Sequence, residues 1–276
     1  MPVNNKNKAK DQIRLNYWNE NYVQYWKSRV TEANASKSEG SSMVAGDVAT
    51  AGDVRYKQAI DLLGVNPRHR LLELGCGFGR SLPVLSLLAC EVDAVDISKQ
   101  MIETAEREYS DININFHVSP SEDMPFRDEK FDRIVCFAAF DAMFQKEALI
   151  EMHRVTKLGG RILLTGKSDN YYPDDRKAYE AELGARAKGH PNYFTDVPKL
   201  LADLGHFGFG KVHAIYYERR GDFADGHGST VLPLQFYEYL LVLEKKGPCK
   251  PNSEVEYCRD ISRTFLLQHE IVSVSK

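Results

Sequence analysis

The chain has 276 residues, a formal net charge of −3, 43% hydrophobic residues and 27% charged residues. This composition is typical of a globular protein, and the length suits one large α/β domain with additions. The acidic balance argues against the basic stripe that a nucleic-acid backbone requires, so we expect no nucleic-acid partner.

The five cysteines are scattered and form no C-x-x-C pair, so we expect neither a disulfide framework nor a zinc site. No apolar run approaches the roughly 18 residues that a membrane-spanning helix needs. The first residues, MPVNNKNKAKDQ, lack the apolar core of a secretion signal. We therefore expect a cytoplasmic protein that does not associate with a membrane.

An aromatic and basic segment opens the chain. Residues 13–30 carry aromatic side chains near helical spacing, which predicts a helix with one aromatic face. A run rich in alanine, serine and glycine follows over residues 33–52. We take residues 1–53 together as an N-terminal helical lid and linker.

Strands and helices then alternate. The pattern predicts helices over 54–63, 82–89, 98–109 and 148–155, with strands over 69–74, 91–95, 112–118, 133–137 and 161–165. Ser98 is the predicted N-cap of its helix. This alternation is typical of a parallel sheet with helices on both faces.

The regular alternation of strands and helices ends after Gly166. Helices are predicted over 175–187 and 197–204, and strands over 211–218 and 236–244, with a glycine-rich loop over 219–235 between them. We expect one domain over 54–247, with insertions 168–195 and 219–235 covering the substrate side. Residues 248–276 form a tail, predicted to be helical over 255–268.

A glycine-rich turn follows the first strand of this domain. Gly75, Gly77 and Gly79 form G-x-G-x-G, which lets a ligand approach the backbone where a Cβ would collide. Arg80 stands where a dinucleotide fingerprint has its third glycine. Asp96 ends the second strand, where a carboxylate can accept hydrogen bonds from both ribose hydroxyls. These residues predict an adenosine cofactor, and by themselves they leave a nicotinamide-dependent oxidoreductase open.

Five segments together resemble one family. They are E-L-G-C-G-F-G (73–79), V-D-I-S (95–98) with Met101, S-E-D-M-P-F (121–126), F-D-R-I-V (131–135) and R-V-T-K-L-G-G-R (154–161). In combination they resemble the class I S-adenosylmethionine-dependent methyltransferases, in particular the ubiquinone and menaquinone methyltransferase subgroup. The resemblance covers about residues 56–166. It implies a Rossmann-like fold, a mainly parallel seven-stranded sheet whose last strand pair is antiparallel, and S-adenosylmethionine as cofactor.

The resemblance also implies roles for individual residues. Residues matching Glu73 and Gly75 hold the methionine moiety of the cofactor, Asp96 binds the ribose, Ile97 and Met101 flank the adenine, and Glu122 and Asp123 lie at its polar edge. Phe137 matches a residue that lines the methyl-transfer crevice. Many members have aspartate where this chain has Pro120, so adenine recognition is expected to depend on Glu122 and on backbone groups. The complete expected cofactor set is Glu73, Gly75, Cys76, Gly77, Gly79, Asp96, Ile97, Met101, Ser121, Glu122, Asp123 and Phe137.

Methyl transfer requires alignment more than side-chain catalysis, but a hydroxyl nucleophile benefits from a general base, and histidine is the usual one. The first candidate is His227 in the glycine-rich loop and the second is His190, although a solvated loop histidine is the commoner meaning of such a residue. Asp141 and Asp169-Asn170 follow strands in a pattern similar to the Mg²⁺ ligands of catechol-type methyltransferases, but each lies farther from its strand. We therefore expect no metal, and loop chemistry explains these residues more simply.

The aromatic N-terminal face has two interpretations. It can pack on the sheet or on a second copy of the chain in a homodimer. Alternatively, Tyr22, Tyr25 or Trp26 can cover the sulfonium of the cofactor by cation–π attraction. We expect methyl transfer to a small molecule, with a hydroxyl oxygen preferred over nitrogen or carbon. A catalytically silent cofactor-binding subunit is the alternative from another class.

Overall fold

The computed structural model describes residues 12, 14–24, 54–187, 189–190, 192–251 and 258–260. The N-terminal part contains a π-helical turn, η1 (Tyr17–Asn21), within a longer helical segment over residues 14–24. We call residues 14–24 the N-terminal segment. The linker of residues 33–52 lies outside the described residues, as does most of the tail.

The domain alternates strands and helices up to β5. In chain order its elements are α3 (Val54–Leu63), β1 (Arg70–Leu74), α4 (Leu82–Ser86), β2 (Glu91–Asp96), α5 (Lys99–Glu108), β3 (Ile114–Val118), β4 (Phe131–Cys136), η3 (Phe140–Ala142), α6 (Gln145–Val155) and β5 (Thr156–Lys167). Every predicted strand and helix of this half is present, with ends that differ by a few residues. The Ser98 side chain accepts a hydrogen bond from the Met101 amide, which confirms the predicted cap.

The second half contains more elements than the sequence predicted. They are α7 (Arg176–Ala187), β6 (Tyr193–Thr195), α8 (Val197–Asp203), η4 (Leu204–Phe207), β7 (Phe209–Tyr217), α9 (Asp222–Asp225), β8 (Gly228–Ser229), β9 (Glu238–Lys245) and β10 (Cys258–Asp260). The predicted helix over residues 255–268 is wrong at residues 258–260, which form β10 and pair antiparallel with β6.

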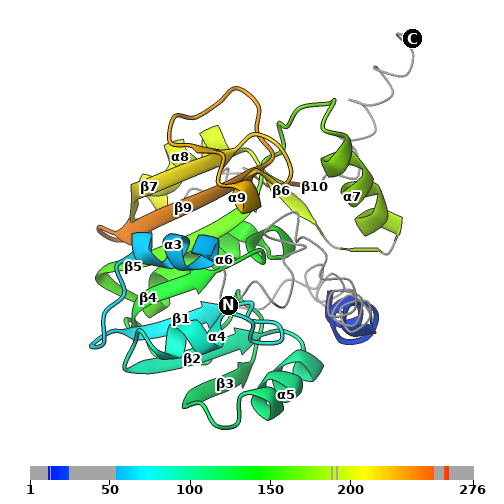
Figure 1. Cartoon of the computed structure of the whole chain (residues 1–276). Coiled ribbons are helices and arrows are strands. Elements are labelled where there is room, and N and C mark those ends of the chain that lie inside the picture. The colour runs from blue at the N-terminus through cyan, green and yellow to red at the C-terminus, as the bar shows by residue number, and fades with distance from the viewer. Residues whose placement is uncertain are drawn as a thin grey trace.

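The main sheet has eight strands in the order β3-β2-β1-β4-β5-β9-β7-β8 (Figure 1). Strands β3 to β5 are parallel, and β9 runs antiparallel to both β5 and β7. The predicted count of seven is wrong because Gly228–Ser229 pairs with the end of β7 and adds an eighth strand. A strand of only two residues has no periodic pattern of apolar side chains, so it could not be predicted from the sequence alone.

Helices cover both faces of the sheet. Side chains of α6 and α8 pack on one face, against Leu72, Ile134 and Leu164. Side chains of α3 and α4 pack on the other, against Leu71, Val135 and Leu163. Alternate residues of the central strands thus enter opposite cores, which explains their continuous apolar sequences. No helix in the described part of the chain is long and apolar enough to cross a membrane.

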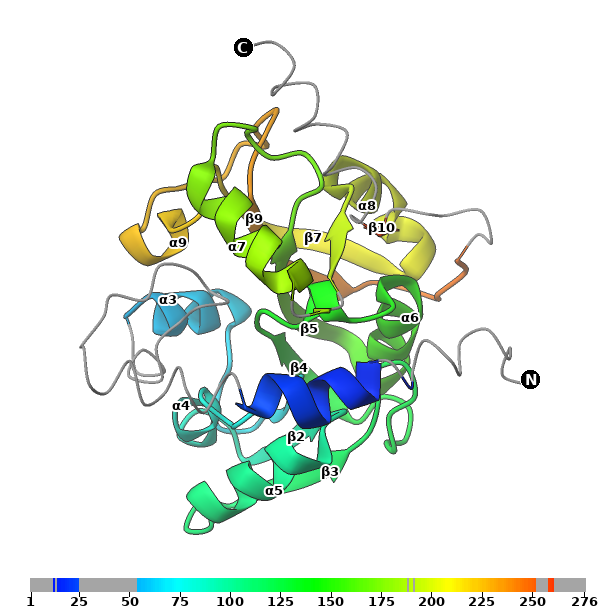
Figure 2. The same ribbon diagram turned by 90° about the vertical axis from the view of Figure 1, so that its right-hand side faces the viewer.

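The N-terminal segment and α7 lie at the carboxyl ends of the parallel strands. Figure 2 views the molecule from this side, with the N-terminal segment in blue in front of the sheet and α7 above it. In open α/β sheets, ligands bind in the crevice outside these strand ends. The fold therefore places both segments over the expected ligand site.

Candidate functional site

The glycine turn after β1 is held against the end of β2. The Gly75 and Cys76 amides donate hydrogen bonds to the Val95 carbonyl, at 2.8 and 3.0 Å. Gly75 has φ 71° and Gly77 has φ 55°, a region that favours glycine. A Cβ on Gly75 would lie 2.5 Å from the Cβ of Ala139. The turn therefore needs glycine here both for its conformation and for the close approach of the β4 loop.

Glu73 is a buried carboxylate on the floor of the pocket, with only 3% of its surface exposed. Ser81 Oγ donates a hydrogen bond to its Oε1, while Oε2 has no hydrogen-bond partner among the described residues. Burial raises the pKa of Glu73 to about 7, against the opposing effects of Ser81 and Arg80. A buried oxygen without a donor fits a ligand that supplies one, such as the amino group of a methionine moiety.

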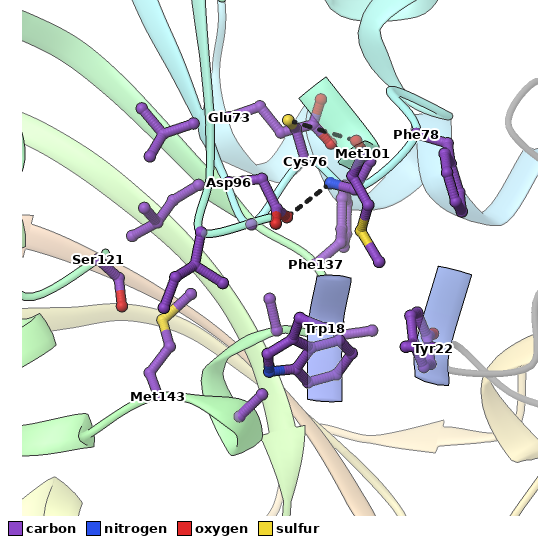
Figure 3. Close-up of a pocket in the computed structure, with 18 of the residues that line it drawn as sticks. Trp18, Tyr22, Glu73, Cys76, Phe78, Asp96, Met101, Ser121, Phe137 and Met143 are labelled. Carbon is purple, nitrogen blue, oxygen red and sulfur yellow. Dashed lines mark hydrogen bonds between the residues drawn. The ribbon is translucent and has the colours of Figure 1, made fainter. Parts of the chain in front are cut away.

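Asp96 lies at the end of β2 and is also buried. Its Oδ2 accepts a hydrogen bond from the Gly77 amide at 2.9 Å, and its Oδ1 accepts one from the Ser98 amide at 2.8 Å. Burial raises the pKa of Asp96, and these backbone donors oppose the rise. Each carboxylate oxygen has a second lone pair, so Asp96 can fix the turn and still accept from ribose hydroxyls. Figure 3 shows this carboxylate beside the cavity.

Ile97, Met101 and Ser121 line the same pocket, at the end expected to hold the adenine. Ser119 lines it as well, two residues from the expected site. Glu122 and Asp123 do not line it. Asp123 is exposed, and the Glu122 carboxylate accepts hydrogen bonds from the Phe144 amide and from Arg14. The structure therefore does not support the expected adenine contacts of these two acids.

Arg14 ties the N-terminal segment to the domain. Its guanidinium donates two hydrogen bonds to the two oxygens of Glu122, at 2.8 and 3.0 Å, and lies 4.3 Å from the centre of the Phe144 ring. Arg14 is 3% exposed. A bidentate, buried pair of this kind is geometrically specific. Glu122 is therefore an anchor for the N-terminal segment, a role that no local sequence pattern reveals, because its partner lies 108 residues away.

The aromatic face of the N-terminal segment is turned toward the pocket. Trp18 and Tyr22 line the cavity, and Figure 3 shows Trp18 across it from Asp96 and Phe137. Ser98 Oγ donates a hydrogen bond to Asn19 Oδ1 at 2.9 Å, which joins the segment to the start of α5. Of the three expected lid aromatics, Tyr22 lies at the site, while Tyr25 and Trp26 lie outside the described residues.

The loop after β4 forms the opposite wall. Phe137 lines the pocket and packs edge-on against Tyr56 at 5.0 Å between ring centres. Ala138 has φ 50°, an unusual value for a residue with a Cβ, and its amide donates to Thr165 Oγ1 at 2.7 Å. Strained backbone held by such a contact is typical of ligand sites. Thr165 thus fixes the loop that would face the transferred methyl group.

Two of the expected acceptor-side residues reach the pocket and one does not. Asp141 and His190 line it. His190 Nδ1 is 2.9 Å from Tyr17 Oη, and its ring contacts the edges of Trp18 and Tyr22. His227 is exposed and does not line the pocket. The structure therefore favours His190 over His227, the reverse of the order taken from sequence.

Asp141 faces an ammonium and not a metal-binding group. Lys167 Nζ lies 3.3 Å from Asp141 Oδ2 and 3.1 Å from Glu182 Oε1. Burial raises the pKa of Asp141, and Lys167 opposes the rise. Among the described residues, no group of three or more histidine, cysteine or acidic side chains could hold a metal ion.

The site therefore fits an adenosyl-methionine ligand at one end. It combines a glycine turn in which a Cβ at Gly75 or Gly79 would collide with its neighbours, a buried carboxylate oxygen lacking a donor at Glu73, a second carboxylate at Asp96, and apolar walls at Ile97 and Met101. Arg80 turns to Tyr56 Oη at 3.0 Å, and its side chain lines the pocket where a dinucleotide site would require glycine.

Comparison with known proteins gives the same result. A family model described as a methyltransferase domain matches residues 72–164, from within β1 to within β5. The chain belongs to the class I S-adenosylmethionine-dependent methyltransferases. This membership selects the cofactor among those that the turn and Asp96 left open, and S-adenosylmethionine is the cofactor of the family.

Two curated relatives illustrate the similarity. The chain is 30% identical over 143 residues to a demethylmenaquinone methyltransferase of Renibacterium salmoninarum, covering 51% of this chain and 60% of the relative. It is 33% identical over 176 residues to an uncharacterized protein, MJ1123, of Methanocaldococcus jannaschii, covering 60% of this chain and 78% of that one. The chain spans 43% to 60% of the length of the first three curated relatives.

A solved methyltransferase shares the fold. The geranyl diphosphate C-methyltransferase of Streptomyces coelicolor A3(2), in complex with Mg²⁺, geranyl diphosphate and S-adenosyl-L-homocysteine, aligns with a TM-score of 0.57 and 16% identity. The alignment covers 72% of this chain and 83% of that one. At this identity the likeness concerns the fold.

The Arg14–Glu122 pair leads to a first testable prediction. Arg14→Met keeps the length of the side chain and removes the charge, so we expect the N-terminal segment to detach and S-adenosylhomocysteine to bind about tenfold more weakly. Of the two tryptophans, Trp18 lies in this segment and Trp26 follows it by two residues in the sequence, so intrinsic tryptophan fluorescence reports on the segment directly. Calorimetry gives the affinity. An unchanged emission spectrum and affinity would show that the ion pair does not hold the segment.

Proposed function

We propose that this methyltransferase transfers the methyl group of S-adenosylmethionine to a hydroxyl oxygen of a small molecule. The single observation that carries the proposal is the position of His190, an imidazole in the wall of the same pocket that contains Glu73, Asp96 and Phe137. A hydroxyl is a weak nucleophile until it loses its proton, and histidine is the side chain best suited to accept that proton near neutral pH.

Different residues of the pocket would bind the cofactor and shield the reaction from water. Glu73 and Asp96 would hold the polar groups of the cofactor, with Ile97 and Met101 beside the adenine. When bound, the cofactor supplies a methyl group that is already strongly electrophilic, so the protein must mainly align the nucleophile and exclude water. Phe137, Trp18 and Tyr22 provide apolar walls for this purpose.

His190 would remove the proton. Tyr17 Oη lies 2.9 Å from its Nδ1 and orients the ring. In the tautomer that this role requires, Nδ1–H donates to Tyr17 Oη and Nε2 carries the free lone pair. Nε2 then accepts the hydroxyl proton as the oxygen–carbon bond forms and the bond from the methyl carbon to sulfur breaks, and the resulting imidazolium releases the proton to solvent after product leaves. Tyr17 therefore acts as a positioning residue.

The test is transfer of a labelled methyl group from S-adenosylmethionine to a panel of small alcohols and phenols. We expect His190→Gln to lower kcat by about 100-fold, a typical contribution of general-base catalysis, and to leave the affinity for S-adenosylhomocysteine unchanged. His206→Gln, at an exposed position, is the matched control and should retain full activity. If His227→Gln lowered kcat and His190→Gln turned over normally, His227 and not His190 would be the general base.

A carbon acceptor is the second candidate function. The observation that favours it is the similarity in fold to the geranyl diphosphate C-methyltransferase, although that protein shares only the fold with this chain. The carbon-13 chemical shift of the transferred methyl group distinguishes an O-methyl from a C-methyl product. A C-methyl product would reject the proposed oxygen chemistry.

A further inference from the structure

A buried group of charged side chains lies beside the pocket, where β5 ends and β9 begins. We call Asp141, Lys167, Glu182, Arg220 and Glu238 the acidic cluster. Four of them are almost completely buried: Asp141, Lys167, Glu182 and Glu238 are 1% to 3% exposed. Charged residues are rarely buried without a function or a full set of partners, so the partners of each need to be traced.

Most members of the cluster are paired. Lys167 Nζ contacts Asp141 and Glu182, and Tyr237 Oη donates to Glu182 Oε1 at 2.6 Å. Arg220 in turn donates to Tyr237 Oη at 2.8 Å. These contacts form a continuous polar network from the pocket wall at Asp141 to α7 at Glu182.

Glu238 is the exception. It stands directly opposite Lys167 in the β5–β9 ladder, yet neither of its carboxylate oxygens has a hydrogen-bond partner in the described part of the chain. Burial raises the pKa of Glu238 to about 7, although Arg220 and Lys167 oppose the rise. A buried carboxylate without hydrogen bonds is destabilising, and a ligand that supplies the missing donor would account for it.

The charge of the cluster indicates what it lacks. Asp141, Glu182 and Glu238 are three carboxylates, against two cations, Lys167 and Arg220. When all five groups are ionised, one negative charge is in excess, beside the ligand pocket that Asp141 lines. The missing component is a cationic hydrogen-bond donor. A metal ion does not suit the position, since among the described residues no group of three or more histidine, cysteine or acidic side chains could hold one.

We propose that the acidic cluster is a subsite for a protonated amine of the methyl acceptor, with Asp141 as the contact residue and Glu238 supplying the compensating negative charge. The inference rests on the proposed function and narrows its substrate class to small molecules that carry both a hydroxyl and a basic nitrogen. An ammonium has no lone pair, so a nitrogen held in this subsite is not the atom that receives the methyl group. The hydroxyl is then the remaining nucleophile.

The first experiment measures binding alone. Protein loaded with S-adenosylhomocysteine is titrated calorimetrically with arylalkylamines, beginning with tyramine, each paired with a neutral counterpart such as 4-ethylphenol. We expect the amines to bind at least about tenfold more tightly, in line with the value of one charge-assisted hydrogen bond. If no amine binds more tightly than its neutral counterpart, the proposal is overturned.

Variants test whether the acidic cluster causes the tighter binding of amines. Asp141→Asn and Glu238→Gln should each remove the preference for the amine, while Glu180→Gln, an exposed carboxylate on α7, should leave it intact. A preference that survives both cluster variants would also overturn the proposal. Because binding is measured without methyl transfer, an amine preference in a protein that transfers no labelled methyl group would reject the proposed function and not the subsite.

The second experiment needs no acceptor. If Glu238 is kept for a ligand, its charge costs stability in the ligand-free protein, so Glu238→Gln should raise the melting temperature at pH 8, where the carboxylate is ionised. We expect a rise of about 2–4 °C, the usual response to a modest stabilisation in a domain of this size. A lower melting temperature would show that Glu238 serves the fold, and would overturn the proposal.

Discussion

Asp96→Ala is expected to weaken binding of S-adenosylhomocysteine by at least about 100-fold, because two charge-assisted hydrogen bonds to a ribose contribute about 1.5–3 kcal/mol each. The structure adds a second cause. The same carboxylate accepts from the Gly77 and Ser98 amides, so its removal also loosens the glycine turn. Isothermal titration calorimetry measures the loss, and thermal unfolding shows whether the domain remains folded.

Two further variants separate these causes. Asp96→Asn retains an oxygen that can accept from a backbone amide but loses the charge, so we expect an intermediate affinity. Asp123→Ala is the matched control, because Asp123 is exposed and does not line the pocket. Unchanged affinity in Asp96→Ala would argue against a ribose contact, and weakened affinity in Asp123→Ala would restore its expected role at the adenine.

Gly75→Ala is expected to destabilise the domain by about 2–4 kcal/mol and to abolish cofactor binding. A Cβ at φ 71° costs about 1 kcal/mol, and its 2.5 Å approach to Ala139 forces the β4 loop outward at a further cost of about 1–3 kcal/mol. Chemical denaturation measures the loss of stability. The displaced loop carries Phe137 and Ala138, so the pocket would lose its shape as well.

Gly159→Ala is a close control for Gly75→Ala. Gly159 has φ 74°, nearly the same conformation, but a Cβ there would meet no atom within 4 Å. The two variants share the conformational cost and differ only in the collision. If Gly75→Ala and Gly159→Ala lowered the free energy of unfolding equally, the close approach of Ala139 would not contribute to the loss of stability.

The cofactor half of the site could be predicted from sequence because its residues are local. Glu73, Gly75 and Gly77 follow one strand and Asp96 ends the next, so parallel pairing of β1 with β2 is enough to bring them together. Likewise, the apolar runs of β1, β4 and β5 identify buried parallel strands without any knowledge of tertiary contacts.

The rest of the site could not be predicted, because it depends on contacts between distant residues. Glu122 matches the family motif, but its carboxylate is held by Arg14, and no pattern links these two positions. His190 and His227 are equivalent in sequence, since each is one histidine in a loop. The structure distinguishes them, because His190 lines the pocket and packs against Tyr17 and Trp18, whereas His227 is exposed.

The short strand β8 also bears on how the edge of the sheet is protected from pairing with another chain. It pairs only with Tyr216 and Tyr217, so in the described part of the chain the rest of β7 is an open sheet edge. Such an edge invites pairing with another chain, and natural proteins counter this with charged side chains and irregular pairing. Here Lys211 and His213 are exposed along β7, and the register with β9 shifts between them. These features discourage edge-to-edge aggregation without covering the strand.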